Sequence, residues 1–286
     1  MKKIPVRHIT SPYDRDDGSR FKIRDVKDLL DGKDLVQELH RHDFFFVLAL
    51  EKGSGTHEID FTQYQVSDNS IFILRPGQVH RLELKSGSTG FLVEFDTSFY
   101  HPEGIITYQR LIRAGNKNFC EFEAGSLKKL LGVLSCMFNE FVSRQEGYIE
   151  VIKASLDIFF IEFIRQSKNP HSILETGNPY TQERLEDFLQ QLEIHIINLK
   201  QVSQYADLLN LSTYQLNAIT KASVGKSASE LISDQIILEA KRYLLATPSQ
   251  VKDIAAHLGY EDISYFIRFF RKHTGYSPEA FRKNFQ

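Results

Sequence analysis

The segment Val251–Arg282, VKDIAAHLGYEDISYFIRFFRKHTGYSPEAFR, constrains the fold of this chain most strongly. Its first part has apolar residues at helical spacing: Val251, Ile254, Ala255 and Leu258. Gly259 follows as a helix stop, and Asp262 is suited to cap the next helix. A short helix, a turn around glycine and a longer helix form the outline of a helix-turn-helix.

The second helix of this segment separates apolar from cationic residues. Phe266 and Phe270 fall on one face, whereas Arg268, Arg271 and Lys272 fall on others. Gly275 ends this helix, and the segment then closes with a short helix that opens at Pro278. DNA-binding motifs present such a cationic outer face. From this outline alone, an ordinary helical hairpin with solvated arginines is an equal alternative.

An upstream segment repeats the same order of elements. Val202–Leu209 predicts a short amphipathic helix, Ser212 caps the next one, and Thr213–Ser223 predicts the longer helix before Gly225. The stretch Asp234–Ala246 predicts one amphipathic helix between the two modules. Two modules joined by one helix could place recognition helices in successive major grooves, roughly 34 Å apart on B-DNA.

Composition limits how such a protein can bind nucleic acid. The 286 residues suggest about two domains, and the net charge of -2 argues against binding through bulk charge. Charge distribution is more informative, because the stretch from Ile263 to Pro278 contains three Lys or Arg residues and no acid. Any DNA contact must therefore come from a local surface.

Cysteine usage and the N-terminus bear on location. Cys120 and Cys136 form no CxxC pair, so neither a disulfide framework nor a zinc site is indicated. The start MKKIPVRHIT has no apolar stretch of a signal peptide, and no apolar run is long enough for a membrane span. We expect a cytoplasmic protein that does not bind membranes.

The N-terminal half has the pattern of a β-protein. Runs such as FFFVLAL (44–50), SIFILR (70–75) and FLVEF (91–95) are rich in β-branched and aromatic residues and are separated by glycine turns. They predict a β-sandwich or barrel. After Gly125 the period becomes helical over two segments with wide apolar faces. One face could cover the barrel and the other a second subunit, or both could pack within one chain.

We therefore expect an α+β chain of two domains, a β-barrel with two following helices and an all-helical domain with two helix-turn-helix motifs. The expected boundaries are an arm at 1–20, a barrel domain at 21–167, a linker at 168–180 and the helical domain at 181–286.

The C-terminal part resembles the AraC/XylS family of bacterial transcription regulators. The residues that carry this resemblance are AKRYLL (240–245), Ile254-Ala255, LGY (258–260), FIRFFRK (266–272) and GYSPEAFR (275–282). The family's ending, G-x-[ST]-P-x-x-[FY]-R, is matched at every fixed position. The first module departs from the family, with Thr220-Lys221 where an aromatic residue and Lys are usual, and Ala218 where an Arg is frequent.

The N-terminal half resembles the cupin-like sensor domain of the same family. His40-Arg41-His42, GSGTH (53–57) and PGQVH (76–80) carry this resemblance. His40, His42 and His80 match three ligand positions of a cupin metal site, but apolar residues fill the positions where a carboxylate is expected. Glu38 is the one substitute at hand. We expect histidines that are structural or bond a ligand, with no metal and no cofactor.

Candidate DNA contacts follow from side-chain chemistry. Arg268 and Asn217 are the leading base readers, because Arg can bond guanine and Asn adenine in pairs. Further base contacts are expected from Thr213, Tyr214, Ile263, Ser264 and Ile267. Phosphate contacts are expected from Lys221, Arg271, Lys272 and Arg282. For Arg282 the alternative is a brace for the last helix.

Strand parity gives the candidate effector site. The residues expected to face the barrel interior are His42, Phe44, Phe46, His80, Leu82, Phe91, Val93 and Phe95. Aromatic rings stack on sugar rings, so a carbohydrate or another metabolite is the expected effector, although core packing explains the same phenylalanines.

These observations favour an effector-controlled, sequence-specific transcription regulator, and we expect an activator that contacts RNA polymerase and forms a homodimer. The alternative is a metal-dependent cupin enzyme, or a sugar-binding sensor, with a vestigial helical domain. We expect no enzymatic activity, because no nucleophile motif or phosphate loop occurs.

Overall fold

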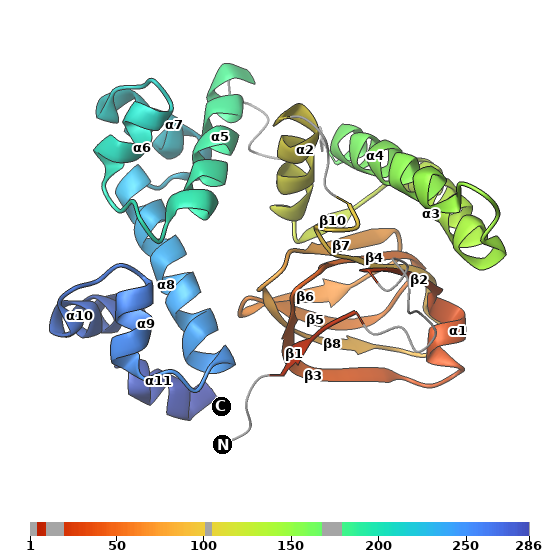
Figure 1. Ribbon diagram of the computed structural model, residues 1–286, viewed down its shortest axis with the longest axis horizontal. Coiled ribbons are helices and arrows are strands. Elements are labelled where there is room, and N and C mark those ends of the chain that lie inside the picture. Colours follow the sequence, from red (N-terminus) through yellow and green to blue (C-terminus); the bar gives the residue numbers. More distant parts are fainter. Residues whose placement is uncertain (1–4, 10–19, 101–104, 168–178, 286) are drawn as a thin grey trace. The chain divides into compact units, whose positions relative to one another are not determined.

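The structure is a computed structural model that describes residues 5–9, 20–100, 105–167 and 179–285. The chain splits into two compact units at Lys168/Asn169 (Figure 1). Most of the predicted linker, residues 168–178, lies outside the described residues. Helix α5 begins at Pro179, so the last two predicted linker residues are helical instead.

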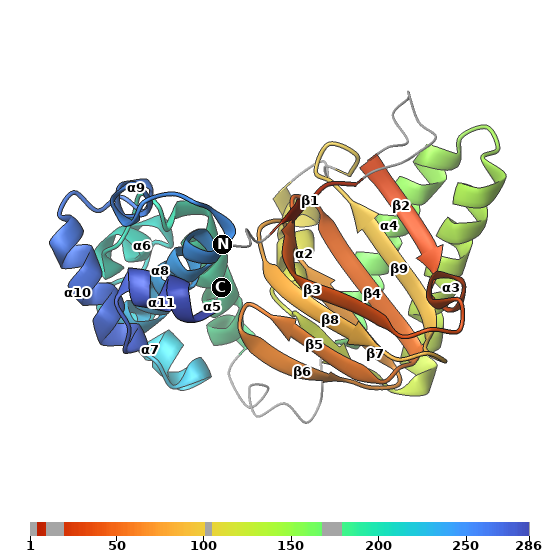
Figure 2. The same ribbon diagram turned by 90° about the horizontal axis from the view of Figure 1, so that it is seen from below.

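The N-terminal unit contains two five-stranded sheets that face each other (Figure 2). The first sheet has the order β1 (Val6–Arg7), β3 (Leu35–His42), β8 (Val79–Leu84), β5 (Gly55–Ile59) and β6 (Thr62–Val66). The second has the order β10 (Phe119–Glu121), β7 (Ser70–Leu74), β4 (Phe45–Lys52), β9 (Thr89–Phe95) and β2 (Phe21–Asp25). The predicted cupin-like barrel is confirmed.

The central strand β4 explains why its sequence is apolar without alternation. It pairs with β7 on one side and β9 on the other, with Val47 opposite both Ile73 and Val93. Phe46 and Leu48 point into the space between the sheets, whereas Phe45 and Val47 belong to the cluster beneath the helices. Both faces are covered, so every position from 45 to 50 is buried.

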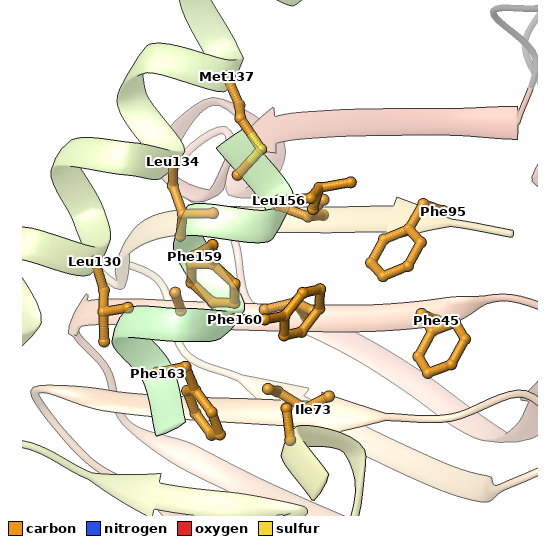
Figure 3. Packing of buried hydrophobic residues seen from close by; sticks show 14 of the residues in the cluster. Phe45, Ile73, Phe95, Leu130, Leu134, Met137, Leu156, Phe159, Phe160 and Phe163 are labelled. Atoms are coloured by element: carbon orange, nitrogen blue, oxygen red, sulfur yellow. The ribbon is translucent and has the colours of Figure 1, made fainter. Parts of the chain in front are cut away.

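Helices cover the outer face of the second sheet. Helix α3 (Ala124–Ser143) and helix α4 (Tyr148–Gln166) are the two predicted helices, and α2 (Ile105–Gly115) precedes them as an unpredicted third. Figure 3 shows Leu134 of α3 and Phe160 of α4 in the same cluster as the strand residues Phe45 and Phe95. This packing joins both helices and the second sheet in one hydrophobic cluster rich in phenylalanine.

The predicted arm is in part a strand. Val6–Arg7 pairs in parallel with β3, and the His8 imidazole lies 2.5 Å from the Asp43 carboxylate. Residues 1–4 and 10–19 of that arm lie outside the described residues.

The C-terminal unit is helical throughout its described length. Its helices are α5 (Pro179–His195), α6 (Val202–Leu208), α7 (Thr213–Val224), α8 (Ala228–Ala246), α9 (Val251–His257), α10 (Ile263–Thr274) and α11 (Pro278–Phe285). Helix α8 packs against α7, α9, α10 and α11. The predicted caps Ser212 and Asp262 accept bonds from the backbone of Gln215 and Tyr265. Both predicted helix-turn-helix modules are confirmed.

The two modules touch directly at the turn of the second one. Gly259 has a φ of 73°, and a Cβ atom there would lie 2.6 Å from the Ile197 carbonyl oxygen. The ammonium of Lys200 lies 5.4 Å from the ring centroid of Tyr260, the residue after that glycine. Tyr260 and Phe269 also pack on the core of the first module. Glycine is therefore required both for its backbone conformation and for close approach.

Among the helices that the structure describes, none combines the length and apolar character that a membrane crossing requires.

Candidate DNA-reading surface and effector site

Helix α10 presents most of the predicted DNA contacts on its exposed side. Phe266 and Phe270 are fully buried and fix the rotation of the helix. The predicted residues on the remaining surface are Ile263, Ser264, Arg268, Arg271 and Lys272, all exposed, and the half-buried Ile267. Ser264, Arg268 and Arg271 follow one another at i, i+4 and i+7, so they line one stripe. The structure brings these side chains together as expected.

Helix α7 is the counterpart of α10 and has the same length of twelve residues. Leu216 and Thr220 are buried where α10 has its two phenylalanines. Thr213, Tyr214 and Lys221 are exposed, with Tyr214 at 82%. The position equivalent to Arg268 carries the exposed Ala218. The first module therefore offers fewer groups that can donate to a base edge.

Asn217 is hydrogen-bonded within the helical unit at both ends of its amide. Its Nδ2 donates to the Thr213 carbonyl at 2.9 Å, and its Oδ1 accepts from the Ala228 N–H at 3.0 Å. Both ends of the amide are thus engaged between α7 and the start of α8. The second bond joins α7 to α8. It also gives an acceptor to the Ala228 N–H, which has none within α8 because it lies in the first turn of that helix. Each end of the amide keeps one further hydrogen-bonding position, so the paired readout of adenine predicted for Asn217 stays a prediction.

Arg282 is likewise a structural residue. Its Nε donates to the Leu244 carbonyl at 2.8 Å and its Nη2 to the Ser249 carbonyl at 2.6 Å. These bonds tie α11 to the end of α8, where carbonyls lack helical partners. These bonds favour the alternative of a brace for the last helix, and the phosphate contact of Arg282 stays a prediction.

The barrel interior contains four histidines that are almost completely buried, His40, His42, His57 and His80. His80 links two of them, with its Nδ1 2.9 Å from His57 Nε2 and its Nε2 2.7 Å from His42 Nε2. His40 Nδ1 lies 2.7 Å from the Glu38 carbonyl oxygen. His57 was not predicted as a site residue, although it is the last residue of GSGTH (53–57), one of the segments that resemble a cupin.

Burial sets the protonation of this histidine cluster. It lowers the pKa of His40 to about 4 and the pKa values of His42 and His57 to about 3. Burial also puts the pKa of His80 well below its ordinary value, and the charges of the neighbouring imidazoles, when they are protonated, and of Arg7 add to the effect. All four rings are therefore neutral near pH 7.

Aromatic residues complete the interior around the histidines. The ring of His42 stacks on Phe44 at 4.4 Å and on Phe46 at 5.4 Å. Leu82 belongs to the same interior cluster. Five of the predicted effector residues, His42, Phe44, Phe46, His80 and Leu82, thus line the barrel interior.

The parity assigned to strand β9 was wrong. Val93 and Phe95 belong to the cluster beneath α3 and α4, and Phe91 packs there too, with its ring 5.8 Å from Phe138. Leu92 occupies the interior instead. Apolar residues cover both faces of this strand, so hydrophobicity alone could not decide which face points inward.

The corrected parity of β9 also turns the carboxylate of Glu94 toward the barrel interior. Glu94 shares the face of Leu92 and accepts a hydrogen bond from Arg24 of β2 at 2.9 Å. Its side chain is 14% exposed. Sequence reasoning missed both residues, although a single glutamate within the apolar run FLVEF was a usable signal.

Three of the histidines could hold a metal ion. His40, His42 and His80 each offer a ring nitrogen, and these atoms lie within 4.8 Å of one another. Glu38, considered as a substitute carboxylate, is exposed on the outside of β3 and contributes only its backbone carbonyl. The candidate donor set therefore consists of imidazoles.

Comparison with known proteins agrees with this geometry. Residues 33–109 match the AraC-like ligand binding domain, and residues 205–284 match a helix-turn-helix domain. The chain is 24% identical over 249 residues to the HTH-type transcriptional activator RhaS of Escherichia fergusonii, covering 85% of this chain and 87% of that protein. It is 24% identical over 257 residues to the uncharacterized HTH-type transcriptional regulator YfiF of Bacillus subtilis, covering 85% and 78%.

Among solved structures, unsaturated fatty acid bound ToxT of Vibrio cholerae aligns with 94% of this chain and 96% of its own, at 17% identity and a TM-score of 0.41.

A sensor barrel followed by two helix-turn-helix modules is the architecture of a ligand-controlled, DNA-binding transcription regulator, and this chain is one. Within that class it combines an AraC-like ligand binding domain with a helix-turn-helix domain and is homologous to RhaS and other AraC family regulators.

Proposed function

We propose that α10 is the principal reader of double-stranded DNA and that Arg268 is its main base reader. The observation that carries this proposal is the exposed stripe of Ser264, Arg268 and Arg271, opposite buried Phe266 and Phe270. A guanidinium donates two parallel hydrogen bonds, which match the O6 and N7 acceptors of guanine in the major groove.

The remaining exposed residues divide by chemistry. Lys221, Arg271 and Lys272 contact phosphates, which fix the register of the protein on the duplex. Thr213, Tyr214 and Ser264 add polar contacts to the grooves, and Ile263 and Ile267 contact thymine methyl groups. The first module contributes affinity more than sequence discrimination, because Ala218 stands where Arg268 stands in the second.

The regulator acts as a homodimer. A chain of net charge -2 has little general attraction to DNA, so affinity must come from several linked modules. Helices α3 and α4 supply a candidate contact surface, with Val142 66%, Val151 39% and Ile158 50% exposed. Exposed aliphatic residues gathered on one pair of helices favour association.

The effector is a small molecule, a carbohydrate or another metabolite, bound in the barrel near His42, Phe44, Phe46, His80 and Leu82. Aromatic faces beside hydrogen-bonding imidazoles suit a ligand with apolar faces and polar edges. Binding shifts the population between DNA-competent and incompetent arrangements. By analogy with the relatives named transcriptional activators, the chain activates transcription through RNA polymerase in the cytoplasm.

Selection of duplexes from a random pool by the full-length protein tests the central proposal. We expect enrichment of a site with two recognisable halves, and retardation of that site at low salt. If the protein is folded and the pool is still random after several rounds of selection, the proposal is contradicted.

The second candidate is a metal-dependent enzyme built on the barrel. The cluster of His40, His42 and His80 is the observation that favours it. We propose that the barrel senses rather than catalyses, since the aligned relatives are transcription regulators. Full activation of a reporter by the chain with no chemical change of its ligand would separate the two.

A further inference from the structure

The histidine cluster has a geometry that neutral packing does not explain. His40 and His80 are directly paired residues of the antiparallel strands β3 and β8, and His42 lies two residues further along β3. The three rings meet between the sheets, with centroids 4.2 to 5.0 Å apart. Bringing three imidazoles together in a buried space sacrifices their hydration, so each needs a partner inside.

Only one of the two ring nitrogens of His40 has a hydrogen-bond partner. Its Nδ1 faces the Glu38 carbonyl, which can only accept, so Nδ1 carries the proton and Nε2 carries a bare lone pair. That Nε2 is buried and has no hydrogen-bond partner. A neutral imidazole with its second nitrogen fixed in this way is the form that binds a metal ion.

His80 is prepared in the same way. Its Nδ1 lies 2.9 Å from His57 Nε2, so a proton on Nδ1 can be donated to His57. This leaves Nε2 of His80 as a lone pair that faces Nε2 of His42 at 2.7 Å. His57 thus orients His80 from behind, as the Glu38 carbonyl orients His40.

We propose that His40, His42 and His80 bind one divalent transition-metal ion through their Nε2 atoms, with His57 as the residue that positions His80. The ion is bound as part of the sensor and is independent of the DNA-reading surface. This inference deepens the proposed effector site and rests on the barrel being the sensor.

Small movements suffice to bind the ion. Zinc–nitrogen bonds of about 2.0–2.1 Å at tetrahedral angles put ligand nitrogens about 3.4 Å apart. The His42–His80 pair must open from 2.7 Å, and the wider pairs must close from at most 4.8 Å. The proton of His42 moves from Nε2 to Nδ1, which is buried and has no partner here. No proton leaves the protein in this step.

The donor set selects the kind of ion. Three imidazoles without a carboxylate favour Zn²⁺, Ni²⁺, Cu²⁺ or Co²⁺ over Mg²⁺, Ca²⁺ or Mn²⁺. The positive charge of Arg7 opposes the binding of a cation at this site. The negative charge of Glu94 attracts the Arg7 guanidinium and raises its pKa, whereas burial lowers it. With three protein ligands, a tetrahedral ion keeps one position for water or for a donor atom of the effector.

Titration of the full-length protein with Co²⁺ after treatment with EDTA tests the proposal. We expect one ion per chain, visible absorption bands of a low-coordinate site, displacement by Zn²⁺ and a rise in Tm. His40→Gln and His80→Gln should abolish the spectrum, whereas His195→Gln, in helix α5 of the other unit, should leave it unchanged. Folded protein that stays silent up to millimolar Co²⁺, or unchanged binding in His40→Gln, would overturn the proposal.

His57→Gln keeps the test decisive if the ligand variants fail to fold. Loss of the group that orients His80 should weaken metal affinity about 10- to 100-fold while retaining the stoichiometry. Unchanged affinity in folded His57→Gln would count against the assigned role. Because the readout is the metal spectrum, a negative result leaves DNA binding intact, and a failure to bind DNA leaves the metal site intact.

Discussion

At the scale of single residues, side chains of the same type have opposite roles. Arg268 is exposed on α10, whereas Arg282 is bonded to two carbonyls between helices. The difference lies in what surrounds each guanidinium, because a group already bonded within the protein has few donors left for DNA. Mutations at these positions should therefore separate recognition from stability.

Arg268→Ala should weaken binding to the selected DNA site by about 1–3 kcal/mol and relax the preference at one base pair. Arg271→Ala, three residues further on, is the matched control for a phosphate contact. It should weaken binding to all sequences alike. It should also reduce, by about one, the slope of the logarithm of the binding constant against the logarithm of the salt concentration. Fluorescence anisotropy at several salt concentrations measures both. An unchanged base preference in Arg268→Ala would show that another residue reads the DNA.

Asn217→Ala should destabilise the C-terminal unit by about 1 kcal/mol, because the Ala228 N–H loses its acceptor. Asn217→Asp keeps an acceptor at the start of α8 and should recover most of this loss. Chemical denaturation of the three proteins gives the comparison. A shift in base preference without loss of stability would identify Asn217 as a base reader instead of a link between α7 and α8.

The buried histidines should make the sensor unit sensitive to acid. Their pKa values, about 4 for His40 and about 3 for His42 and His57, are lower than the ordinary 6.5, so the unfolded chain binds more protons. The contribution of these neutral histidines to the free energy of unfolding is therefore fully present above pH 6.5 and is lost as the pH falls toward 3. Each pKa unit corresponds to about 1.4 kcal/mol.

We expect the denaturation midpoint, measured with EDTA present, to fall continuously from pH 6.5 to pH 4. His57→Gln should make this dependence less steep. A midpoint that is constant over the same range would mean that the rings are solvated.

At the scale of elements, the short turns determine how helices and strands meet. The turn between α9 and α10 has to pass close to the loop after α5, and only glycine leaves room for the Ile197 carbonyl. This contact joins two modules that the sequence connects only through α8. We infer that it fixes the spacing of the two reading helices.

Gly259→Ala should test that contact, with Gly225→Ala as its control. Both glycines are left-handed, with φ values of 73° and 71°, but only Gly259 has atoms close to the position of a Cβ. Gly225→Ala should cost about 1–2 kcal/mol through backbone strain. Gly259→Ala should cost clearly more and weaken binding to two-part sites more than to single half-sites. Equal costs in a denaturation assay would contradict the contact's importance.

At the scale of the whole molecule, the exposed aliphatic residues of α3 and α4 bear on assembly. The barrel uses one side of these helices, while Val151 and Ile158 stay exposed on α4. Ile158→Lys should shift a homodimer toward monomer in sedimentation velocity. Val36→Lys, at an equally exposed position on β3, should have no such effect. A wild-type chain that is monomeric at high micromolar concentration would contradict the role of this surface in dimerisation.

Much of the architecture could be predicted because it is encoded locally. Helix periodicity, the caps Ser212 and Asp262 and the glycine stops all act within a few residues. The same local signals placed the exposed stripe of α10 correctly. Strand positions were also clear, since turns and β-branched runs are short-range features.

Features decided by partners distant in sequence could not be predicted. Strand β9 is apolar on both faces, so only its pairing with β2 and β4 settled that Leu92 and Glu94 point inward. His57 joined the cluster because β5 lies beside β8. The bonds that link Asn217 to the Ala228 N–H and Arg282 to the Leu244 carbonyl likewise join residues 11 and 38 positions apart.

The sequence by itself thus determined the order of domains, the two helix-turn-helix modules and the residues that α10 exposes, because short-range periodicity specifies a helix face. Tertiary structure alone decided which groups remain free to act. A side chain is available to DNA, to a ligand or to a metal only if the folded chain has not already supplied its partner, and that depends on neighbours brought together by folding.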